Sequence, residues 1–492
     1  MPVIRDPYSS AIRPVLEGRR GAVSAAHPLA VSAGQEILLA GGTAVDAAIA
    51  AQAVLTVLAP DACGLGGDML CLVHEPGGTV HAINGAGAAP AAYAGEELEG
   101  ANGITVPGIV AAWSQASRRW GRLALADALQ PAIRIARQGF RLTNILETAC
   151  IAQRDRLLAG GAESWALMGL SRGDLFVQPA LAGLLEAIAR DGEAAFYQGY
   201  AAEAIARAVG ALGGRLSRDD LANHACEIVA AIVTEWSGVK VATQPPMAQG
   251  ILLNMALAAV EQSGRPTGAA ADHAGIELTE SSFAYRARVG EGLALLDERL
   301  TFDPERALLR GGPRAYLHTA GVAVSDDSGL TVSSLVSVFD DFGSCVYVPE
   351  CGITLNDRAA GFGPAPNDVA AGKRPVHTLA PALVVSSDGA LALATPGADG
   401  QVQTLLQVLS KIYRDGEDIA SAVAAPRWRS ENGNVLIEES HPARAALAAK
   451  GHALRPLADG DTRFGAVVLA GTLDQAPIAV SDWRRMTWSG VI

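Results

Sequence analysis

The sequence after Gly312 constrains the fold more than any other part of the chain. Residues 319–348 read TAGVAVSDDSGLTVSSLVSVFDDFGSCVYV, in which small, β-branched and polar residues alternate and turn sequences fall at SDDSG and DDFG. This pattern predicts a run of short strands. Residues 382–397, ALVVSSDGALALATPG, predict further strands around a turn. We therefore expect much of the C-terminal third of the chain to form β-sheet.

Segments with helical spacing lie on both sides of this strand-rich block. Residues 25–57 carry apolar residues at helical spacing, interrupted at Gly41 and Gly42, which predicts two packed helices. A β-hairpin is expected over residues 69–83. Since strands and helices do not alternate as in βαβ units, we predict helices stacked outside a pair of mostly antiparallel sheets. Further helices, each with one buried face, are expected over residues 110–139, 179–211 and 402–413.

Composition excludes several classes of function. Half of the 492 residues are apolar and 18% are charged, which is typical of a globular protein with a large core. The net charge of -13 argues against a nucleic-acid partner, because phosphate binding requires clustered Lys and Arg. The N-terminus lacks the apolar core of a signal peptide, and no apolar run approaches the roughly 20 residues that span a bilayer. We therefore expect a cytoplasmic protein without a membrane partner, whose six scattered cysteines are free thiols.

The familiar catalytic motifs are missing from the sequence. GLGGD at residues 64–68 lacks the Lys-Ser/Thr pair of a phosphate-binding loop and precedes a strand instead of a helix. No H-E-x-x-H or comparable ligand spacing predicts a metal site. There is also no G-x-S-x-G sequence and no cysteine with a nucleophile signature.

Thr319 is a candidate nucleophile of another kind. A threonine at the start of a strand is usually only a β-former. Its hydroxyl becomes a useful nucleophile if a backbone cut makes it N-terminal, because its own α-amino group then serves as the base near neutral pH. Acyl transfer also needs hydrogen-bond donors for the oxyanion, and the small residues of TPGADG, residues 395–400, form a turn that could supply them.

Taken together, the chain resembles the γ-glutamyltransferase family of N-terminal-nucleophile hydrolases over nearly its whole length. The resemblance rests on eight segments that occur in the same order. They are GGTAVDAA (41–48), GLGGDM (64–69), TVPGIVAAW (105–113), GRLALADALQPAIRIARQGF (121–140), FGSCVYVPECGITLND (342–357), KRPVHTLAPALV (373–384), TPGADGQVQTLLQVL (395–409) and APRW (425–428).

The resemblance implies an α+β fold, a four-layer αββα sandwich, and no metal or organic cofactor. It also implies cleavage between His318 and Thr319 into a large subunit, residues 1–318, and a small subunit, residues 319–492, that together form one intertwined domain. We expect a homodimer or a heterotetramer of two large and two small subunits. The residues assigned by position are Thr319 as nucleophile, Ser337 as its hydroxyl neighbour, Gly397 and Ala398 as oxyanion donors, and His377 and Thr378 at two substrate-contacting serines.

This chain departs from the family pattern at the positions that select the substrate. The nucleophile is followed by Ala-Gly, where relatives often read Thr-His after the first threonine. Relatives that bind γ-glutamyl groups carry an arginine at the position of Ala86 and acidic or amide residues at Phe339 and Gly361. Without these ionic side chains the preference for a γ-glutamyl group should be lost, because a site that pairs with a charged substrate group strongly rejects substrates that do not match it. Arg358, Arg374 or His377 could bind a carboxylate from another direction, although each also has a structural explanation.

We therefore predict a self-processing amidohydrolase that acts on a small-molecule, non-glutamyl amide. A small amidated acid such as oxamate and a cephalosporin-acylase-like amide both fit this description. Two alternatives stay open: a genuine γ-glutamyl hydrolase or transpeptidase with glutathione as substrate, and a binding protein that neither processes itself nor catalyses a reaction.

Overall fold

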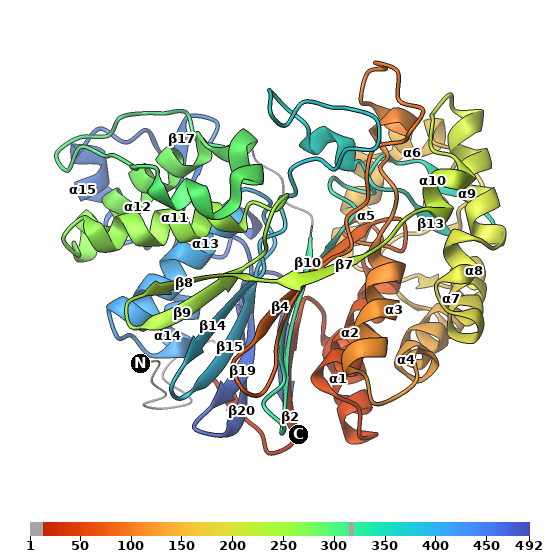
Figure 1. The fold of residues 1–492 in the computed structure, drawn as a ribbon, viewed down its shortest axis with the longest axis horizontal. Helices are drawn as coiled ribbons and strands as arrows, with labels where there is room; N and C mark the ends of the chain where they lie inside the picture. The colour runs from red at the N-terminus through yellow and green to blue at the C-terminus, as the bar shows by residue number, and fades with distance from the viewer. Residues whose placement is uncertain (1–12, 314–318) are drawn as a thin grey trace.

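Two seven-stranded sheets lie face to face in the computed structural model, which describes residues 13–313 and 319–492 (Figure 1). All neighbouring strands within these two sheets are antiparallel. The first sheet has the order β1 (Leu16–Glu17), β20 (Ala476–Ser481), β19 (Val468–Leu473), β15 (Gly389–Ala394), β14 (Ala382–Ser386), β9 (Val239–Thr243) and β8 (Ile232–Trp236). The second has the order β21 (Trp488–Val491), β2 (Gly21–Ala25), β10 (Ala320–Asp326), β11 (Thr331–Ser337), β3 (Asp68–His74), β4 (Val80–Asn84) and β7 (Glu227–Ala230).

A thin apolar layer fills the space between the sheets. Leu72 and Leu335 from the second sheet share a buried cluster with Leu383 from the first. Ser333 Oγ on β11 donates a hydrogen bond of 2.7 Å across this layer to the carbonyl of Leu393 on β15. Since alternate residues of a strand point to the same face, every second residue of β11 faces the other sheet.

Helices cover the outer faces of both sheets (Figure 1). Beside the second sheet lie α1 (Pro28–Leu39), α2 (Ala44–Leu58), α3 (Ile109–Trp120), α4 (Leu125–Gln138), α5 (Asn144–Ala152), α6 (Arg154–Ala159), α7 (Pro179–Asp191), α8 (Ala194–Tyr197), α9 (Tyr200–Ala211) and α10 (Arg218–Ala222). Beside the first sheet lie α11 (Gly250–Gln262), α12 (Gly268–Phe283), α13 (Gly400–Leu409), α14 (Ile419–Ala424) and α15 (Arg444–Ala449). A small sheet of β16 (Trp428–Glu431), β17 (Asn434–Glu438) and β18 (Leu454–Leu457) joins the second group of helices.

A local sequence signal, the capping box at Thr43, sets where helix α2 begins in the layer beside the second sheet. Its residues are buried throughout, because the helix lies between the second sheet and other helices. Thr43 caps its N-terminus: the Asp46 N–H donates to Thr43 Oγ1 at 3.2 Å, and the Thr43 N–H donates to Asp46 Oδ2 at 2.9 Å. This reciprocal capping box satisfies two N–H groups that a helix end otherwise leaves unpaired. The Gly-Gly-Thr sequence therefore ends one helix and starts the next.

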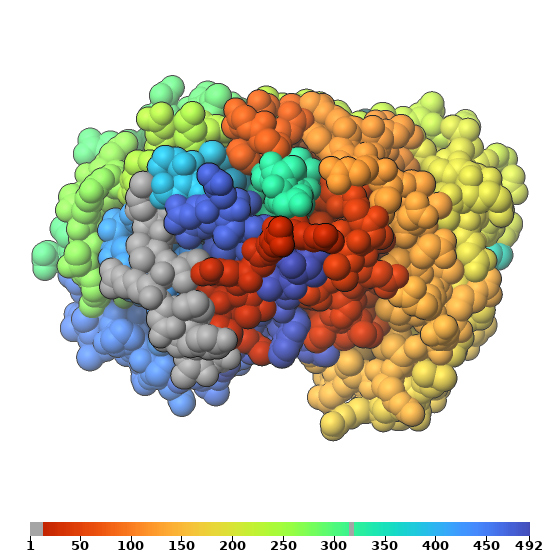
Figure 2. Space-filling view, turned by 90° about the horizontal axis from the view of Figure 1, so that it is seen from below, coloured from red at the N-terminus to blue at the C-terminus, as the bar shows by residue number. Residues whose placement is uncertain are grey.

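The two ends of the described chain meet on one face of the molecule. Figure 2 shows N-terminal residues in red packed beside C-terminal residues in dark blue. Arg19 and Arg20 each donate a backbone hydrogen bond of 2.7 Å to the carbonyl of Ile492, and the Ile492 N–H donates to the carbonyl of Gly21 at 3.0 Å. Both large sheets contain strands from before and after Thr319, so neither sheet belongs to one half of the sequence.

The predicted αββα sandwich is therefore confirmed. The hairpin expected over residues 69–83 is β3 paired with β4, and the helices expected around the two glycines are α1 and α2. The helical segments at 110–139 and 179–211 each divide into shorter helices. Six free cysteines lie in the described residues, as predicted. Within the same residues, the helices are too short or too polar to cross a membrane.

Candidate active site

Thr319 lies at the edge of the second sheet, one residue before β10 begins. The sequence pattern predicts that this strand starts at Thr319, whereas in the structure it starts at Ala320. Ala320 pairs with Val336, and the next residue of β11, Ser337, pairs with Asp68 at the start of β3. Thr319, Ser337 and Asp68 therefore occupy the same end of three neighbouring strands, and all three are buried. His318, predicted on the other side of the cleavage point, lies outside the described residues.

The side chains of Ser337 and Asp68 face the layer between the sheets. Ser337 has the same strand parity as Ser333, which reaches across that layer, and directly opposed residues of antiparallel strands point to the same face. The Ser337 hydroxyl also accepts a hydrogen bond of 2.9 Å from the N–H of Phe339. The register thus places the Ser337 hydroxyl on the strand next to Thr319 and the Asp68 carboxylate one strand further away.

The first sheet contributes the other predicted residues to the site. His377 and Thr378 precede β14, while Gly397 and Ala398 follow β15, and these two strands are paired. Buried Gln249 connects the two segments, because its Nε2 donates to the carbonyl of Thr378 at 2.6 Å and to that of Ala398 at 3.0 Å. A single side chain therefore fixes the predicted substrate segment to the predicted oxyanion turn.

The turn at Gly397 and Ala398 is built as a pair of hydrogen-bond donors. Both residues have positive φ, +126° and +47° respectively, and helix α13 begins two residues later at Gly400. Within the described chain neither N–H donates a hydrogen bond, whereas their carbonyls accept from the N–H groups of Gly400 and Gln401. A left-handed alanine costs roughly 1–2 kcal/mol, so this conformation is stabilised by its surroundings. Two N–H groups that have no acceptor among the described residues, at a helix N-terminus, suit a developing negative charge.

A buried ionic cluster lies at the Asp68 end of the site. Arg358 Nε donates to Asp68 Oδ2 at 3.1 Å, and His377 Nε2 lies 3.2 Å from the same oxygen. His377 Nδ1 accepts from the N–H of Leu379, so the proton of the neutral ring is on Nε2 and points to Asp68. Burial, reinforced by the charge of Arg358, lowers the pKa of His377 to about 4. The imidazole is therefore neutral at physiological pH.

The guanidinium of Arg358 is only partly satisfied. Its Nη1 and Nη2 have no hydrogen-bond partner among the described residues, and neither does Asp68 Oδ1. Burial lowers the pKa of Arg358, against the opposing charge of Asp68. The ring of Phe339 lies 4.7 Å from Arg358 Cζ, and Phe339 has a φ of +88°. The apolar ring of Phe339 thus packs over the fully buried guanidinium of Arg358.

Two of the remaining predicted positions, Ala86 and Gly361, carry no charged side chain. Ala86 is buried after β4, where its N–H donates to Asn84 Oδ1 at 3.0 Å. Gly361 leaves no room for a side chain without backbone movement, because a Cβ atom there would lie 2.6 Å from the carbonyl oxygen of Val376. Arg374 pairs with Glu227 through partly exposed side chains.

A cavity of about 410 Å³ opens beside Thr319. Ala26, which follows β2, lines this cavity, whereas Asp68 starts β3 on the far side of β11. Because β2 and β11 flank β10 on opposite sides, this wall of the cavity and the Asp68 cluster lie on opposite sides of Thr319. Its wall combines an apolar majority with a few charged groups, and Pro396 of the oxyanion turn is part of it. Other lining residues are His27, Leu55, Leu58, Asp61, Ile145, Leu146, Asp341, Arg485 and Met486.

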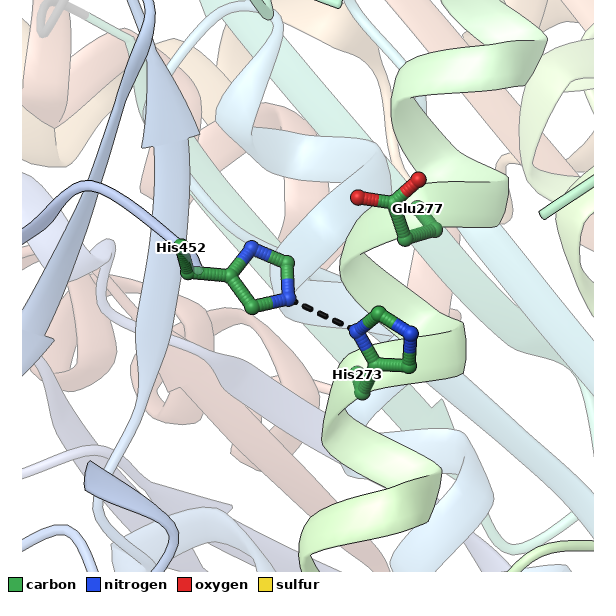
Figure 3. A group of neighbouring side chains, drawn as sticks. All are labelled: His273, Glu277 and His452. Carbon is green, nitrogen blue, oxygen red and sulfur yellow. Dashed lines mark hydrogen bonds between the residues drawn. The ribbon is translucent and has the colours of Figure 1, made fainter. Parts of the chain in front are cut away.

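One group of side chains has metal-ligand chemistry, but it lies on α12 and beside β18. His273, Glu277 and His452 have ligand atoms within 4.8 Å of one another (Figure 3). His273 Nδ1 and His452 Nε2 are 2.7 Å apart and share a hydrogen bond, while Glu277 accepts from Leu308 and Arg310. The facing atoms therefore already have protein partners, and the group is better described as a hydrogen-bonded network.

Sequence reasoning missed two residues that organise the site. Asp68 lies in GLGGDM, but the sequence assigned it no role in the site, because its place next to Ser337 depends on the pairing of β3 with β11. Gln249 lies in the sequence PPMAQG, where nothing marks it as a link between residues 378 and 398. Gln249 contacts residues that lie about 130 and 150 positions further along the chain, and local sequence patterns do not encode such contacts.

Comparison with known proteins agrees with this geometry. The family model for gamma-glutamyltranspeptidase matches residues 30–298 and 306–490. The chain belongs to the gamma-glutamyltranspeptidase family. The Acylase ACY 1 proenzyme of Pseudomonas sp. (strain SE83) is 32% identical over 94% of both chains. The oxamate amidohydrolase proenzyme of Klebsiella pneumoniae is 32% identical over 90% of this chain and 93% of its own.

Solved structures of the gamma-glutamyltranspeptidase family have the same fold. Cephalosporin acylase from Bacillus halodurans superposes with a TM-score of 0.87 at 28% identity, covering 100% of this chain and 99% of its own. By contrast, the glutathione hydrolase proenzyme of Bacillus subtilis is 25% identical over 83% of this chain and 80% of its own. This member is thus more similar in sequence to the acylase and amidohydrolase relatives than to that glutathione hydrolase.

Proposed function

We propose that this protein is a self-processing amide hydrolase with Thr319 as its nucleophile and a non-glutamyl acyl specificity. One observation carries the proposal: Thr319 stands at a strand end beside Ser337, and the neighbouring turn presents two unused N–H groups, those of Gly397 and Ala398. A nucleophile and a pair of oxyanion donors are the minimum for acyl transfer. Several relatives are named as proenzymes, which is consistent with maturation by cleavage.

Maturation would hydrolyse the peptide bond between His318 and Thr319. One water molecule is consumed, residue 318 gains a carboxylate, and Thr319 gains a free α-amino group. The products would be a large subunit of residues 1–318 and a small subunit of residues 319–492. Because an α-amino group has a pKa of roughly 7.7 to 8, a useful fraction is unprotonated at neutral pH and can act as the base.

In turnover, the Thr319 hydroxyl attacks the carbonyl carbon of the substrate amide while its proton passes to the α-amino group. The N–H groups of Gly397 and Ala398 stabilise the oxyanion, each contributing about 2.7–4 kcal/mol. The proton then moves to the departing nitrogen, the amine leaves, and an ester remains on Thr319. Water, or an amine in a transfer reaction, attacks this ester and restores the enzyme.

The substrate would be an amide whose acyl part lacks the γ-glutamyl α-amino group. Ala86, Phe339 and Gly361 offer no ionic partner for a zwitterionic acyl group, and Gly361 is closed to any larger residue by the Val376 carbonyl. Arg358 is a fully buried cation at this end of the site, and two of its nitrogens have no hydrogen-bond partner among the described residues, so a small amidated acid is favoured. His377 and Thr378 would contact the substrate from the first sheet. No metal or organic cofactor takes part in this mechanism, and we expect a cytoplasmic homodimer or heterotetramer.

A panel of p-nitroanilides tests this specificity. We expect the enzyme to hydrolyse γ-glutamyl-p-nitroanilide with a kcat/KM at least about 100-fold below that for the best acyl anilide, since unmatched ionic groups are rejected strongly. The release of p-nitroaniline measures the rate. Glutaryl-p-nitroanilide is the matched control, because it differs from the γ-glutamyl compound only by the α-amino group. If the γ-glutamyl compound were the best substrate, the alternative of a glutathione-directed enzyme would replace this proposal.

A further inference from the structure

Residues 298–313, which come before the proposed cleavage point in the sequence, form a long irregular segment. Among the described residues no helix or strand occurs between Asp297 and Ala320. Residues 301–313 are nevertheless held by hydrogen bonds every few positions. An irregular segment lacks the regular backbone hydrogen bonds of a helix or sheet, so its path is set by the groups that bind its N–H and C=O groups. Two of those groups are the buried side chains of His273 and Glu277 on α12, and the buried His452 before β18 holds His273 in turn.

His273 on α12, shown beside His452 in Figure 3, holds the first part of this segment. Its Nε2 lies 2.7 Å from the carbonyl oxygen of Asp303, and because a carbonyl only accepts, the ring proton must be on Nε2. His273 Nδ1 then accepts from His452 Nε2 at 2.7 Å. Burial, with His273 as the second cause, lowers the pKa of His452 to about 4, so this pair is held together without a charge on His452 at neutral pH.

Glu277, one turn further along α12, holds the next part. Its carboxylate accepts from the N–H of Leu308 at 3.0 Å and from Arg310 Nη1 at 2.7 Å. Arg310 Nη2 donates in turn to the carbonyl of Thr301 at 2.6 Å, which closes the segment on itself. The Glu277 side chain is 1% exposed, and that of Arg310 is 23% exposed. Removing Arg310 would leave the buried Glu277 carboxylate without its cationic partner, which is strongly destabilising.

The end of the segment is fixed on the hairpin that supports the oxyanion turn. The N–H groups of Asn432 and Gly433, between β16 and β17, donate to the carbonyls of Pro313 and Gly311. Arg429 on β16 packs against the turn so closely that a Cβ atom at Gly400 would lie 2.8 Å from its Nη1. The same hairpin therefore contacts both the segment before the cleavage point and the donors proposed to stabilise the oxyanion.

We propose that His273, Glu277 and His452 are positioning residues for self-cleavage, which hold the segment before Thr319 in place during maturation but take no part in turnover. The proposal rests on the proposed self-processing of this enzyme. It follows from geometry, because only five residues separate Pro313 from Thr319, whereas no atom of the three side chains lines the cavity beside Thr319. A displacement of about 1 Å at a reacting group lowers a rate about 100-fold.

The test compares maturation with turnover in His273→Ala and Glu277→Gln. Precursor is made by cell-free translation, and the appearance of the fragment that starts at Thr319 is followed over time. We expect cleavage to slow about 100-fold in both variants, while the fully cut fraction keeps the wild-type kcat. Arg306→Gln is the matched control: Arg306 lies in the same segment but pairs with the Asp303 carboxylate through an exposed side chain, so its loss should leave the cleavage rate unchanged.

Further variants separate positioning from simple loss of stability. Glu277→Asp keeps the charge and should restore part of the cleavage rate, and Arg310→Gln provides a more exposed change in the same network. Thermal unfolding of each variant in an uncut Thr319→Ala background reports its stability directly. Wild-type cleavage rates in folded His273→Ala and Glu277→Gln, or kcat values that fall with the cleavage rate, would overturn this inference alone. A wild-type chain that is never cut would instead refute the proposed function.

Discussion

Thr319→Ala is expected to give a folded, uncut chain of 492 residues without amidase activity. The change removes the hydroxyl that serves both the backbone cleavage and the attack on substrate, so both steps fail together. Loss of a nucleophile of this kind lowers kcat by about 10⁶-fold. Denaturing electrophoresis, N-terminal sequencing and an acyl anilide assay measure the two effects. One full-length band and no product above background are the expected results.

Thr319→Ser provides the control for this variant. Serine keeps a hydroxyl on the same α-carbon as the future amine, so cleavage and turnover should persist, although at altered rates. Two fragments from Thr319→Ala, or a new N-terminus at another residue in the wild-type enzyme, would assign the nucleophile elsewhere. A single stable band from the wild type after long incubation would favour the alternative of a non-processing binding protein.

Asp482→Asn is expected to lower the free energy of unfolding by about 3–5 kcal/mol, because it leaves buried cations short of a partner. The Asp482 carboxylate lies 2.6 Å from Arg427 Nη2 and 3.0 Å from Arg484 Nη1, and both arginines are fully buried. It also accepts from the N–H of Val467 at 3.1 Å. Arg484 is shared with Glu438, so the cluster joins β20 to the β16–β17 hairpin. Urea denaturation of the uncut Thr319→Ala chain measures the loss.

The effect of Asp482→Asn should also depend on pH. Burial alone would raise the pKa of Asp482, but the charges of Arg427 and Arg484 outweigh it and hold the pKa below its usual value. A depressed carboxyl pKa stabilises the fold above the pKa of the unfolded chain, and this stabilisation disappears as the pH falls through the folded-state pKa. The difference between the two proteins should therefore shrink in acid. A constant difference at every pH, or a loss as small as that of exposed Asp191→Asn, would contradict this explanation.

Much of the fold could be predicted from the sequence, because its signals are local. The Gly-Gly-Thr break between α1 and α2, the hairpin of β3 and β4, and the strands around SDDSG all follow from spacing and turn residues. Strand order could not be predicted in this way. Nothing near Asp68 states that β3 pairs with β11, and this pairing depends on burial of both strands between a helical layer and the other sheet.

The residues of the candidate site also fall into two groups: those that local motifs identify and those whose roles depend on long-range contacts. Thr319, Ser337, Gly397 and Ala398 were identified from motifs and from the family resemblance, and the fold brings their segments to one end of the sandwich. The role of Gln249 and the orientation of His377 could not be anticipated, since they depend on long-range hydrogen bonds: two from Gln249 to backbone carbonyls and one between His377 and the Asp68 carboxylate. Patterns in sequence locate reactive residues better than the polar side chains that orient them.

The interleaved sheets constrain how this protein can be made. Strands β10 and β11 lie in the interior of one sheet and β14, β15 and β19 in the interior of the other, and all five come after Thr319. A polypeptide ending at residue 318 would lack the middle of both sheets and would expose unpaired strand edges that promote aggregation. Two separately translated halves should therefore assemble poorly, whereas the uncut chain keeps the strands of both halves in one molecule while it folds.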